Sequence, residues 1–345
     1  MKRFVKIYTY WLLGMLLFTG CDDYLKEDSG DLLIPGKVDE FLPMLYKEGF
    51  PQNFNEEVAW LYLMTDDVEM GQLELDPDDE SYETRDKNSL DVLSAGEGEE
   101  PYKWEREIKS YADNFWERRY GNILACNLVI DALPEMKYVE ADSGVYNFLA
   151  AQAYALRAYY YWCLVNSYAL PWSKENLDKP GVIIRTEPQI DISARERSSI
   201  RDVYDLINGD IKEAEKYIKV ATFDGNIHRL SEPAILLLAS RIALFQENWD
   251  EVIRTGELFL AQNSVILNLN DQDTTLFGTE KGLNNKIFTM MDGTINKEVV
   301  FTFGTSSYTP YDYLSTSGAF YGLGFRPSHS TDESLIRSYE EGDLR

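Results

Sequence analysis

The chain has 345 residues and carries 59 acidic against 33 basic side chains, a formal net charge of −26. Such a negative field repels nucleic-acid phosphates and anionic lipid surfaces, so nucleic acid is excluded as a partner. Hydrophobic residues make up 44% of the sequence, which is enough for a substantial core and excludes a globally disordered chain.

The first twenty residues have the pattern of an export signal. Three basic residues lie within the first six positions, an almost wholly apolar run extends over Ile7–Phe18, and the small residues Thr19 and Gly20 follow. The run is shorter than the roughly 20 apolar residues that a membrane-spanning helix needs. The sequence therefore predicts that residues 1–20 are a cleaved signal peptide rather than a transmembrane anchor.

Cys21 comes directly after this run. The letters FTGC resemble the lipobox of bacterial lipoproteins, in which the cysteine is lipidated and begins the mature chain. Several acyl chains together anchor a protein stably, whereas one alone binds a membrane only marginally. The alternative is a plain signal peptide with an incidental cysteine. Cys126 and Cys163 lie in apolar helical patterns, which predicts buried thiols rather than a disulfide framework.

An acidic stretch with little apolar periodicity runs over residues 66–100. Loops of this length are usually functional or disordered. Asp76, Asp78 and Glu80 stand at alternate positions, as in part of a calcium-binding loop, but the following glycine and the distal glutamate are missing. This pattern favours a solvated acidic loop over a calcium site, and we predict no metal or cofactor.

The next two segments are predicted to be long helices. In residues 115–136 the apolar stripe includes Asn127, which is expected to be a buried polar group satisfied by backbone partners. In residues 146–172 small side chains form one face, which allows a second helix to approach closely. Tyrosines recur every seven residues on another face of this helix and are expected to pack in the core. The alanines are Ala151, Ala155 and Ala158, and the tyrosines are Tyr154, Tyr161 and Tyr168.

Two further segments carry helix-start signals. In residues 197–218 either Ser198 or Ser199 is expected to cap a helix. In residues 229–262 Ser231 is the expected cap, and the letters EN interrupt the helical pattern before Trp249. So short a break predicts an antiparallel helical hairpin, which resembles a tetratricopeptide unit.

Beyond Asn263 the pattern changes. Residues Glu298–Phe303 alternate in the manner of a short β-strand. The stretch after this predicted strand is rich in glycine, serine, tyrosine and proline and is predicted to be a loop. Its aromatic residues show no helical period, so they have a weaker claim to the core than aromatics on a helix stripe.

Motifs that would mark an enzyme are missing from the sequence. It contains no G-x-S-x-G, no P-loop, no G-x-G-x-x-G and no cysteine or histidine pair with zinc-site spacing. A glycosidase pair of carboxylates is not excluded, but nothing singles one out among so many acidic residues. We therefore predict that the chain is not an enzyme.

Five stretches together resemble the SusD/RagB family of nutrient-uptake lipoproteins on Gram-negative outer membranes. Each stretch alone is weakly specific, but their conjunction is specific and covers most of the chain. The stretches are CDDYLKE, WERRYGNILACNLVID, ALRAYYYWCLVNSYALPW, RLSEPAILLLASRIALFQENWDEVI and FRPSHSTDESLIRSYEEGDLR.

The resemblance implies a mainly α-helical domain over residues 21–345, a scaffold of tetratricopeptide-like hairpins with long irregular loops and little β-structure. The family normally continues beyond the final Asp-x-Arg, so its usual C-terminal portion is expected to be missing here. The resemblance also implies a palmitate-bearing lipid anchor on Cys21 and a surface-exposed place on the outer membrane. There the protein would bind a glycan and deliver it to a SusC-type TonB-dependent transporter.

Ligand contacts cannot be transferred by motif, because the family's recognition loops differ greatly between members. On composition alone we expect them in two loop regions, with ordinary loop packing as the alternative for each residue. The residues are Tyr82, Arg85, Tyr102, Trp104, Tyr308, Tyr311 and Tyr313. Two other functions remain open: a peptide- or protein-binding importer component on the same scaffold, and a secreted glycoside hydrolase.

Overall fold

The structure is a computed structural model that describes part of the chain. All of the described residues belong to one compact unit that spans Lys37–Arg345. They are residues 37–51, 64, 68–70, 100, 103–106, 115–189, 193–266, 297–303 and 325–327. The predicted signal peptide and Cys21 lie outside these residues and stay predictions. Within the described part, no helix is both long and apolar enough to cross a membrane.

The described elements are mostly helices, which confirms the predicted fold class. They are, in chain order, α2 (Val38–Met44), the π-helix η2 (Leu45–Gly49), β1 (Val68–Met70), α6 (Phe115–Ala132), the 3-10 helices η3 (Leu133–Glu135) and η4 (Glu140–Asp142), α7 (Ser143–Tyr168), α8 (Ile200–Ile218), α9 (Glu232–Phe245), α10 (Trp249–Gln262) and β2 (Phe325–Pro327). The two short strands pair antiparallel, with Glu69 opposite Arg326.

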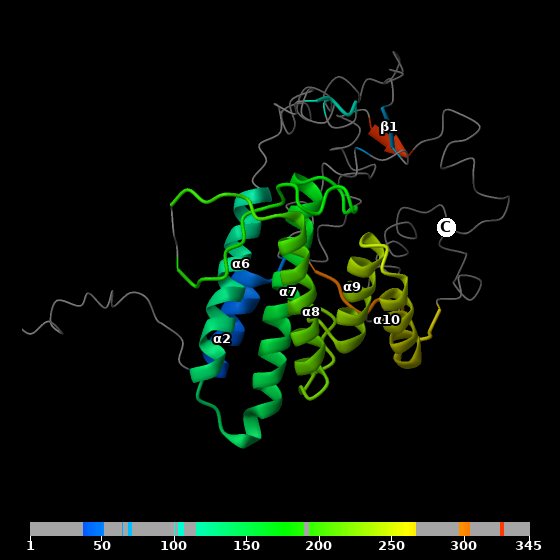
Figure 1. The fold of residues 1–345 in the computed structure, drawn as a ribbon. Helices are drawn as coiled ribbons and strands as arrows, with labels where there is room; N and C mark the ends of the chain where they lie inside the picture. Colours follow the sequence, from blue (N-terminus) through cyan, green and yellow to red (C-terminus); the bar gives the residue numbers. More distant parts are fainter. Residues whose placement is uncertain are drawn as a thin grey trace, which may run out of the picture. The chain divides into compact units, whose positions relative to one another are not determined.

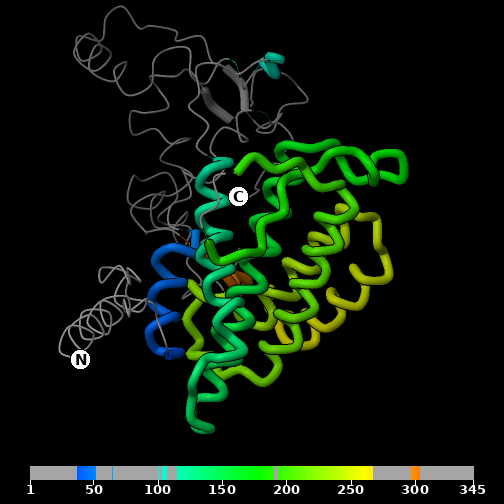
Figure 2. Tube along the Cα trace, turned by 60° about the vertical axis from the view of Figure 1, so that its left-hand side comes forward, coloured from blue at the N-terminus to red at the C-terminus, as the bar shows by residue number. Residues whose placement is uncertain are grey.

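Helix α7 lies at the centre of the packing. It contacts α6 on one side and α8 on the other, and the order continues from α8 to α9 and from α9 to α10 (Figure 1). The segment α2–η2 packs on α6 and α7, as Figure 2 shows in blue beside the teal helix. Neighbours in sequence are therefore neighbours in space, as in stacked helical hairpins.

The small side chains of α7 explain how its neighbours come so close. Ala151, Ala155 and Ala158 are all fully buried, as the sequence pattern predicted. The side-chain amide of Gln152 is buried among them and forms two hydrogen bonds with the backbone of Leu230. Its Nε2 donates to the carbonyl at 2.8 Å, and its Oε1 accepts from the N–H at 2.8 Å. The chain entering α9 is thus fixed to the middle of α7.

Side-chain caps begin the later helices where the sequence indicated. Ser199, not Ser198, caps α8 in a capping box with Asp202. The hydroxyl of Ser231 accepts from the N–H of Ala234 at the start of α9, and Asn248 caps α10. The predicted hairpin of α9 and α10 is confirmed.

The predicted strand at Glu298–Phe303 is wrong. The described residues 297–303 contain no strand. Their backbone instead runs beside the chain that leads into α9, where the N–H of Thr302 donates to the carbonyl of Ile227 at 3.0 Å. The side chains of His228 and Ser231 bond to carbonyls of this stretch. Alternation alone does not make a strand, because a β-ladder needs a partner strand in register.

The two cysteines of the helices are buried thiols outside any disulfide, which confirms their predicted place in the core. Cys126 is completely buried on α6, and burial raises the pKa of its thiol well above the ordinary value. A thiol of raised pKa forms little of the reactive thiolate, so Cys126 acts as a packing residue.

Candidate functional site

Among the predicted ligand contacts, Trp104 is the one that the structure describes. The other six are Tyr82, Arg85, Tyr102, Tyr308, Tyr311 and Tyr313, and they lie outside the described residues together with the calcium-loop fragment Asp76, Asp78 and Glu80. Their arrangement around Trp104 remains a prediction. In the described part of the chain, no group of three or more histidine, cysteine or acidic side chains is placed to hold a metal ion.

Trp104 presents its indole to solvent. The side chain is 68% exposed, and the backbone of this residue has φ 53°. A positive φ is a strained conformation for a bulky L-residue, and such strain gathers at functional sites. A hydrogen bond from the N–H of Glu105 to the carbonyl of Glu100 closes the turn at 3.1 Å. The loop therefore holds an aromatic face in the open, as the prediction for a ligand contact requires.

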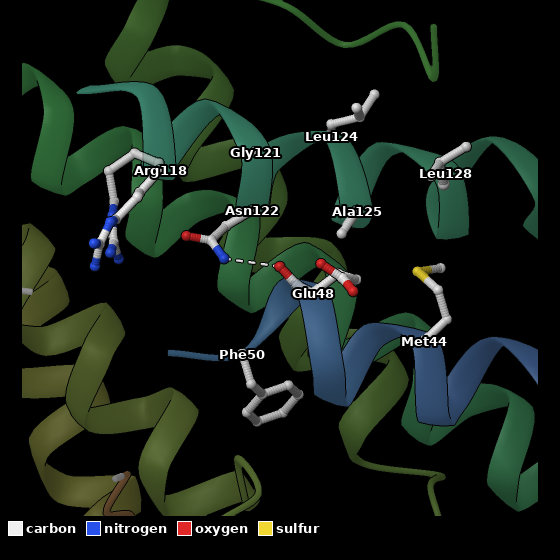
Figure 3. A pocket seen from close by; sticks show the side chains of 10 residues that line it. Met44, Glu48, Phe50, Arg118, Gly121, Asn122, Leu124, Ala125 and Leu128 are labelled. Carbon is white, nitrogen blue, oxygen red and sulfur yellow. Dashed lines mark hydrogen bonds between the residues drawn. The ribbon is translucent and has the colours of Figure 1, made fainter. Parts of the chain in front are cut away.

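A groove lies between the N-terminal helices and α6. We call it the α2–α6 groove, and its volume is about 510 Å³. Figure 3 shows its lining, which consists of Met44, Glu48, Phe50, Arg118, Arg119, Gly121, Asn122, Leu124, Ala125 and Leu128.

The π-helix η2 shapes one wall of this groove. The side-chain amide of Asn122 donates to the carbonyl of Glu48 at 2.8 Å, the dashed line in Figure 3. The hydroxyl of buried Tyr160 donates to the carbonyl of Gly49. These bonds satisfy carbonyls at the end of η2, which otherwise have no intrahelical partner. The wall is thus fixed by α6 and α7, and π-helical turns of this kind are often found at functional sites.

The chemistry of the groove differs from that of Trp104. Its lining is largely aliphatic, with Met44 on the α2 side and Leu128 on the α6 side, and it also includes the charged side chains of Glu48 and Arg118 (Figure 3). The aromatic residue in the described lining is Phe50, which is 5% exposed and offers no open ring face. The groove therefore suits an apolar segment with charged ends better than the flat face of a sugar ring.

Buried polar side chains beneath the loop after α7 hold that loop through its backbone. Asn127 donates to the carbonyls of Arg185 and Glu187 at 3.0 and 3.3 Å. The hydroxyl of Tyr161 donates to the carbonyl of Arg185 and accepts from its N–H, both at 2.7 Å. Tyr120 donates to the carbonyl of Ile183 at 2.7 Å, and burial raises its pKa to about 12. The prediction that Asn127 is buried and backbone-satisfied is confirmed.

An ion pair lies below this network. Arg157 binds Asp210 with two hydrogen bonds, from Nε at 2.8 Å and from an Nη at 2.7 Å. Its other Nη donates to the side-chain oxygen of Asn127 at 2.9 Å. Both charged side chains are less than a tenth exposed. The pair joins α7 to α8 and also orients the amide that holds the loop, so loop and scaffold form one polar network.

The tyrosines of α7 are not equally buried. Tyr161 is fully buried, as expected, whereas Tyr154 and Tyr168 are partly buried and pack against the core, and the ring of Tyr154 stacks on Tyr217 of α8. A seven-residue repeat drifts by about 20° per heptad around a straight helix, which accounts for the different burial of tyrosines spaced by seven residues.

The α2–α6 groove was missed at the sequence level. Its lining residues are separated by more than sixty positions, because Met44 to Phe50 and Arg118 to Leu128 meet only in the folded chain.

The comparison with known families gives a match over most of the helical region. A SusD-like family model, described as starch-binding and associating with the outer membrane, matches residues 44–244, more than half of the chain. SusD-like protein P38 of Formosa agariphila is 27% identical over 158 residues, which are 45% of this chain and 27% of that protein.

Solved structures share the fold. A SusD-like carbohydrate-binding protein from Bacteroides vulgatus is 20% identical, with a TM-score of 0.50 over 69% of this chain and 47% of its own. A second SusD superfamily protein from Bacteroides vulgatus is 18% identical, with a TM-score of 0.50 over 65% of this chain and 46% of its own. The chain thus spans about half the length of these solved relatives.

Proposed function

Because this chain belongs to the SusD-like family, we propose that it is a glycan-binding lipoprotein on the surface of the outer membrane. The observation that carries the proposal is the family match over residues 44–244, the region that forms the helical scaffold. That family is described as starch-binding, and one structural relative as carbohydrate-binding. A glycan is therefore the first ligand to test.

The exposed indole of Trp104 supports this proposal chemically. Sugar rings have apolar faces that lie flat on aromatic rings, while their hydroxyls need polar partners nearby. Trp104 supplies an open ring held on a closed turn. The six other predicted contacts, Tyr82, Arg85, Tyr102, Tyr308, Tyr311 and Tyr313, are proposed to add ring faces and hydrogen-bonding groups from loops.

Binding without turnover is the activity we propose. The sequence has no G-x-S-x-G, P-loop or G-x-G-x-x-G motif, and the SusD-like family is described as starch-binding. Delivery of the glycan to a SusC-type TonB-dependent transporter, and a lipid anchor on Cys21, complete the proposal. The neutral or uncharged character of most glycans also agrees with the net charge of −26, which would repel anions.

The test is a binding measurement with soluble starch and its oligosaccharides, by calorimetry and by retardation in a polysaccharide gel. We expect the wild-type protein to bind, and Trp104→Ala to weaken binding by about ten-fold, since loss of one stacking face costs on the order of 1.4 kcal/mol. Trp249→Ala is the matched control, because Trp249 is similarly exposed but lies on α10.

Two results would overturn the proposal. One is a folded wild-type protein that binds no member of a panel of starch, β-glucan and other plant and algal polysaccharides. The other is steady release of reducing ends from any of them, which would make the chain an enzyme.

The α2–α6 groove favours a second candidate function, binding of a peptide. The groove has a largely aliphatic lining together with the carboxylate of Glu48 and the guanidinium of Arg118. A surface of this kind suits an apolar peptide segment. The gene neighbourhood separates the two functions. A TonB-dependent transporter beside glycosidase genes would favour glycans, and one beside peptidase genes would favour peptides.

A further inference from the structure

Four tyrosines form a continuous aromatic surface on α7 and α8, far along the chain from Trp104. We call this the tyrosine strip: Tyr138, before η4, Tyr146 and Tyr154 on α7, and Tyr217 on α8. Tyr138 stacks on Tyr146 with ring centroids 4.4 Å apart. Tyr146 meets Tyr217 edge to face at 6.4 Å, and Tyr217 lies parallel to Tyr154 at 6.0 Å.

The backbone under the tyrosine strip is held firmly. Close to it, the N–H of Thr222 donates to the carbonyl of Gly144 at 3.0 Å, which joins the chain leaving α8 to the first turn of α7. A Cβ at position 144 would meet the hydroxyl oxygen of Thr222 at 2.0 Å, so only glycine permits this approach. Tyr146 and Tyr217 are therefore carried by helices whose ends are locked together, and their rings form a preorganised surface.

The strip is partly open to solvent. Tyr138 is 46% exposed, and Tyr146, Tyr154 and Tyr217 are partly buried, with one side of each ring packed against the core. Each ring contacts at least one other ring of the strip. A contiguous row of rings that is not fully buried is an aromatic patch, a feature that marks binding surfaces.

Three of the four phenol hydroxyls are available to a ligand. The hydroxyl of Tyr146 donates to the carbonyl of Leu133 at 3.1 Å. Those of Tyr138, Tyr154 and Tyr217 make no hydrogen bond in the part of the chain that the structure describes. Burial is the main cause that raises the pKa of both Tyr146 and Tyr154, and the nearby hydroxyl of Tyr217 adds to it. Both phenols therefore stay neutral and can donate hydrogen bonds.

The charges at the border of the strip cancel. The ammonium of Lys216 lies 4.9 Å from the ring centroid of Tyr217 and pairs with Glu213 at 2.8 Å. The cation over the Tyr217 ring is therefore already paired, and the net charge of −26 repels an anion. The ligand class that fits is neutral, with flat apolar faces to stack on rings and hydroxyls to meet phenols. Carbohydrate has this chemistry.

We propose that the tyrosine strip is a second glycan-binding surface, separate from the one that includes Trp104. This inference rests on the proposed function and adds a place on the helical scaffold where the glycan makes contact. A polysaccharide chain that reaches both surfaces binds more tightly than either surface alone accounts for, because the second contact becomes intramolecular.

The experiment uses the full chain and the starch ligands chosen above. Tyr138→Ala with Tyr217→Ala removes two ring faces, and Tyr154→Phe removes one hydroxyl while keeping the ring and its packing. We expect the double variant to weaken polysaccharide binding by about ten-fold and Tyr154→Phe by about five-fold. The control is Phe223→Ala, which removes a comparably exposed ring that belongs to a different cluster, against Phe148.

Each outcome is decisive. If the wild-type protein and Trp104→Ala differ in starch binding but Tyr154→Phe and the folded double variant bind as the wild type does, the strip is not a glycan surface and the proposed function stands. The strip would then be a packing feature or a protein contact. If no glycan binds the wild type, the proposed function fails first and this inference fails with it. Circular dichroism confirms folding of every variant.

Discussion

Helix α7 lies in the middle of the helical packing and α10 at its end, and they differ in how many of their side chains are buried. More than half of the 26 residues of α7 are buried, because α6, α8 and the α2–η2 segment all pack on it. In α10 Thr255 is the one buried residue, because α10 packs chiefly on α9. Both helices are rich in apolar side chains, so the difference teaches that burial in stacked hairpins comes from neighbouring helices.

The open face of α10 follows a regular pattern. Trp249, Ile253 and Leu260 repeat at helical spacing, and each is more than half exposed. A helix with this stripe normally faces another helix. Such a stripe on α7 would be buried by the neighbouring helices, whereas on α10 no described segment covers it. Three predictions test how far this contrast between interior and edge extends.

The largest expected effect is at the buried ion pair. Arg157→Ala leaves the carboxylate of Asp210 buried without its partner and should lower the free energy of unfolding by about 3–5 kcal/mol. Urea denaturation measures it. Arg201→Ala is the control, since the Arg201–Asp178 pair is exposed and should cost less than about 1 kcal/mol. A loss below 1 kcal/mol for Arg157→Ala would contradict the role of the pair in the interior.

A second effect should appear in alkali and come from tyrosines that lie outside α9 and α10. Burial raises the pKa of Tyr46 and of Tyr120 to about 12 from an ordinary value of 10.0, and α9 and α10 contain no tyrosine. A raised folded-state pKa favours the neutral phenol in the fold. The contribution of these two phenols to the free energy of unfolding is therefore fully present below pH 10 and is lost as the pH rises through about 12.

Near-UV absorbance of tyrosinate, followed together with helical circular dichroism, tests this alkaline loss. We expect late ionisation of these phenols to accompany loss of helix. If all tyrosines ionise near their ordinary pKa while the helices persist, the interior phenols are open to water and the prediction is wrong.

The smallest effect belongs to the edge. Ile253→Ser on α10 should change the free energy of unfolding by no more than about 0.5 kcal/mol, because the side chain is largely exposed. Ile242→Ala on α9 is the comparison, since that side chain is buried and its loss should cost about 2–5 kcal/mol. A cost above 1 kcal/mol for Ile253→Ser would mean that the edge face is covered in the folded chain.

Much of the helical scaffold could be predicted from the sequence, because the information was local. Ser199 and Ser231 were recognisable caps, the alanine face of α7 was a short-range pattern, and the break before Trp249 was only a few residues long. The strand predicted at Glu298–Phe303 is wrong because strand pairing is non-local. An alternating pattern shows that a segment could pair, but it does not show that a partner strand lies beside it.

The candidate sites were harder to predict for the same reason. Composition singles out Trp104, and the structure shows its side chain exposed, while its contact with a ligand stays a prediction. The α2–α6 groove and the tyrosine strip each join residues from distant segments, such as Tyr146 and Tyr217, which come together only when α7 and α8 pack. Residue type alone does not separate the partly buried Tyr154 from the fully buried Tyr161.

The network beneath the loop after α7 also bears on how the protein can diversify. Tyr120, Asn127 and Tyr161 bind that loop only at main-chain atoms of residues 183–187. Every amino acid carries the carbonyls that these side chains use, and every amino acid except proline carries the N–H from which Tyr161 accepts, so these bonds place little demand on which side chains the loop displays. Substitutions at its outward-facing positions can therefore leave these bonds in place, and one frame can support different outward surfaces.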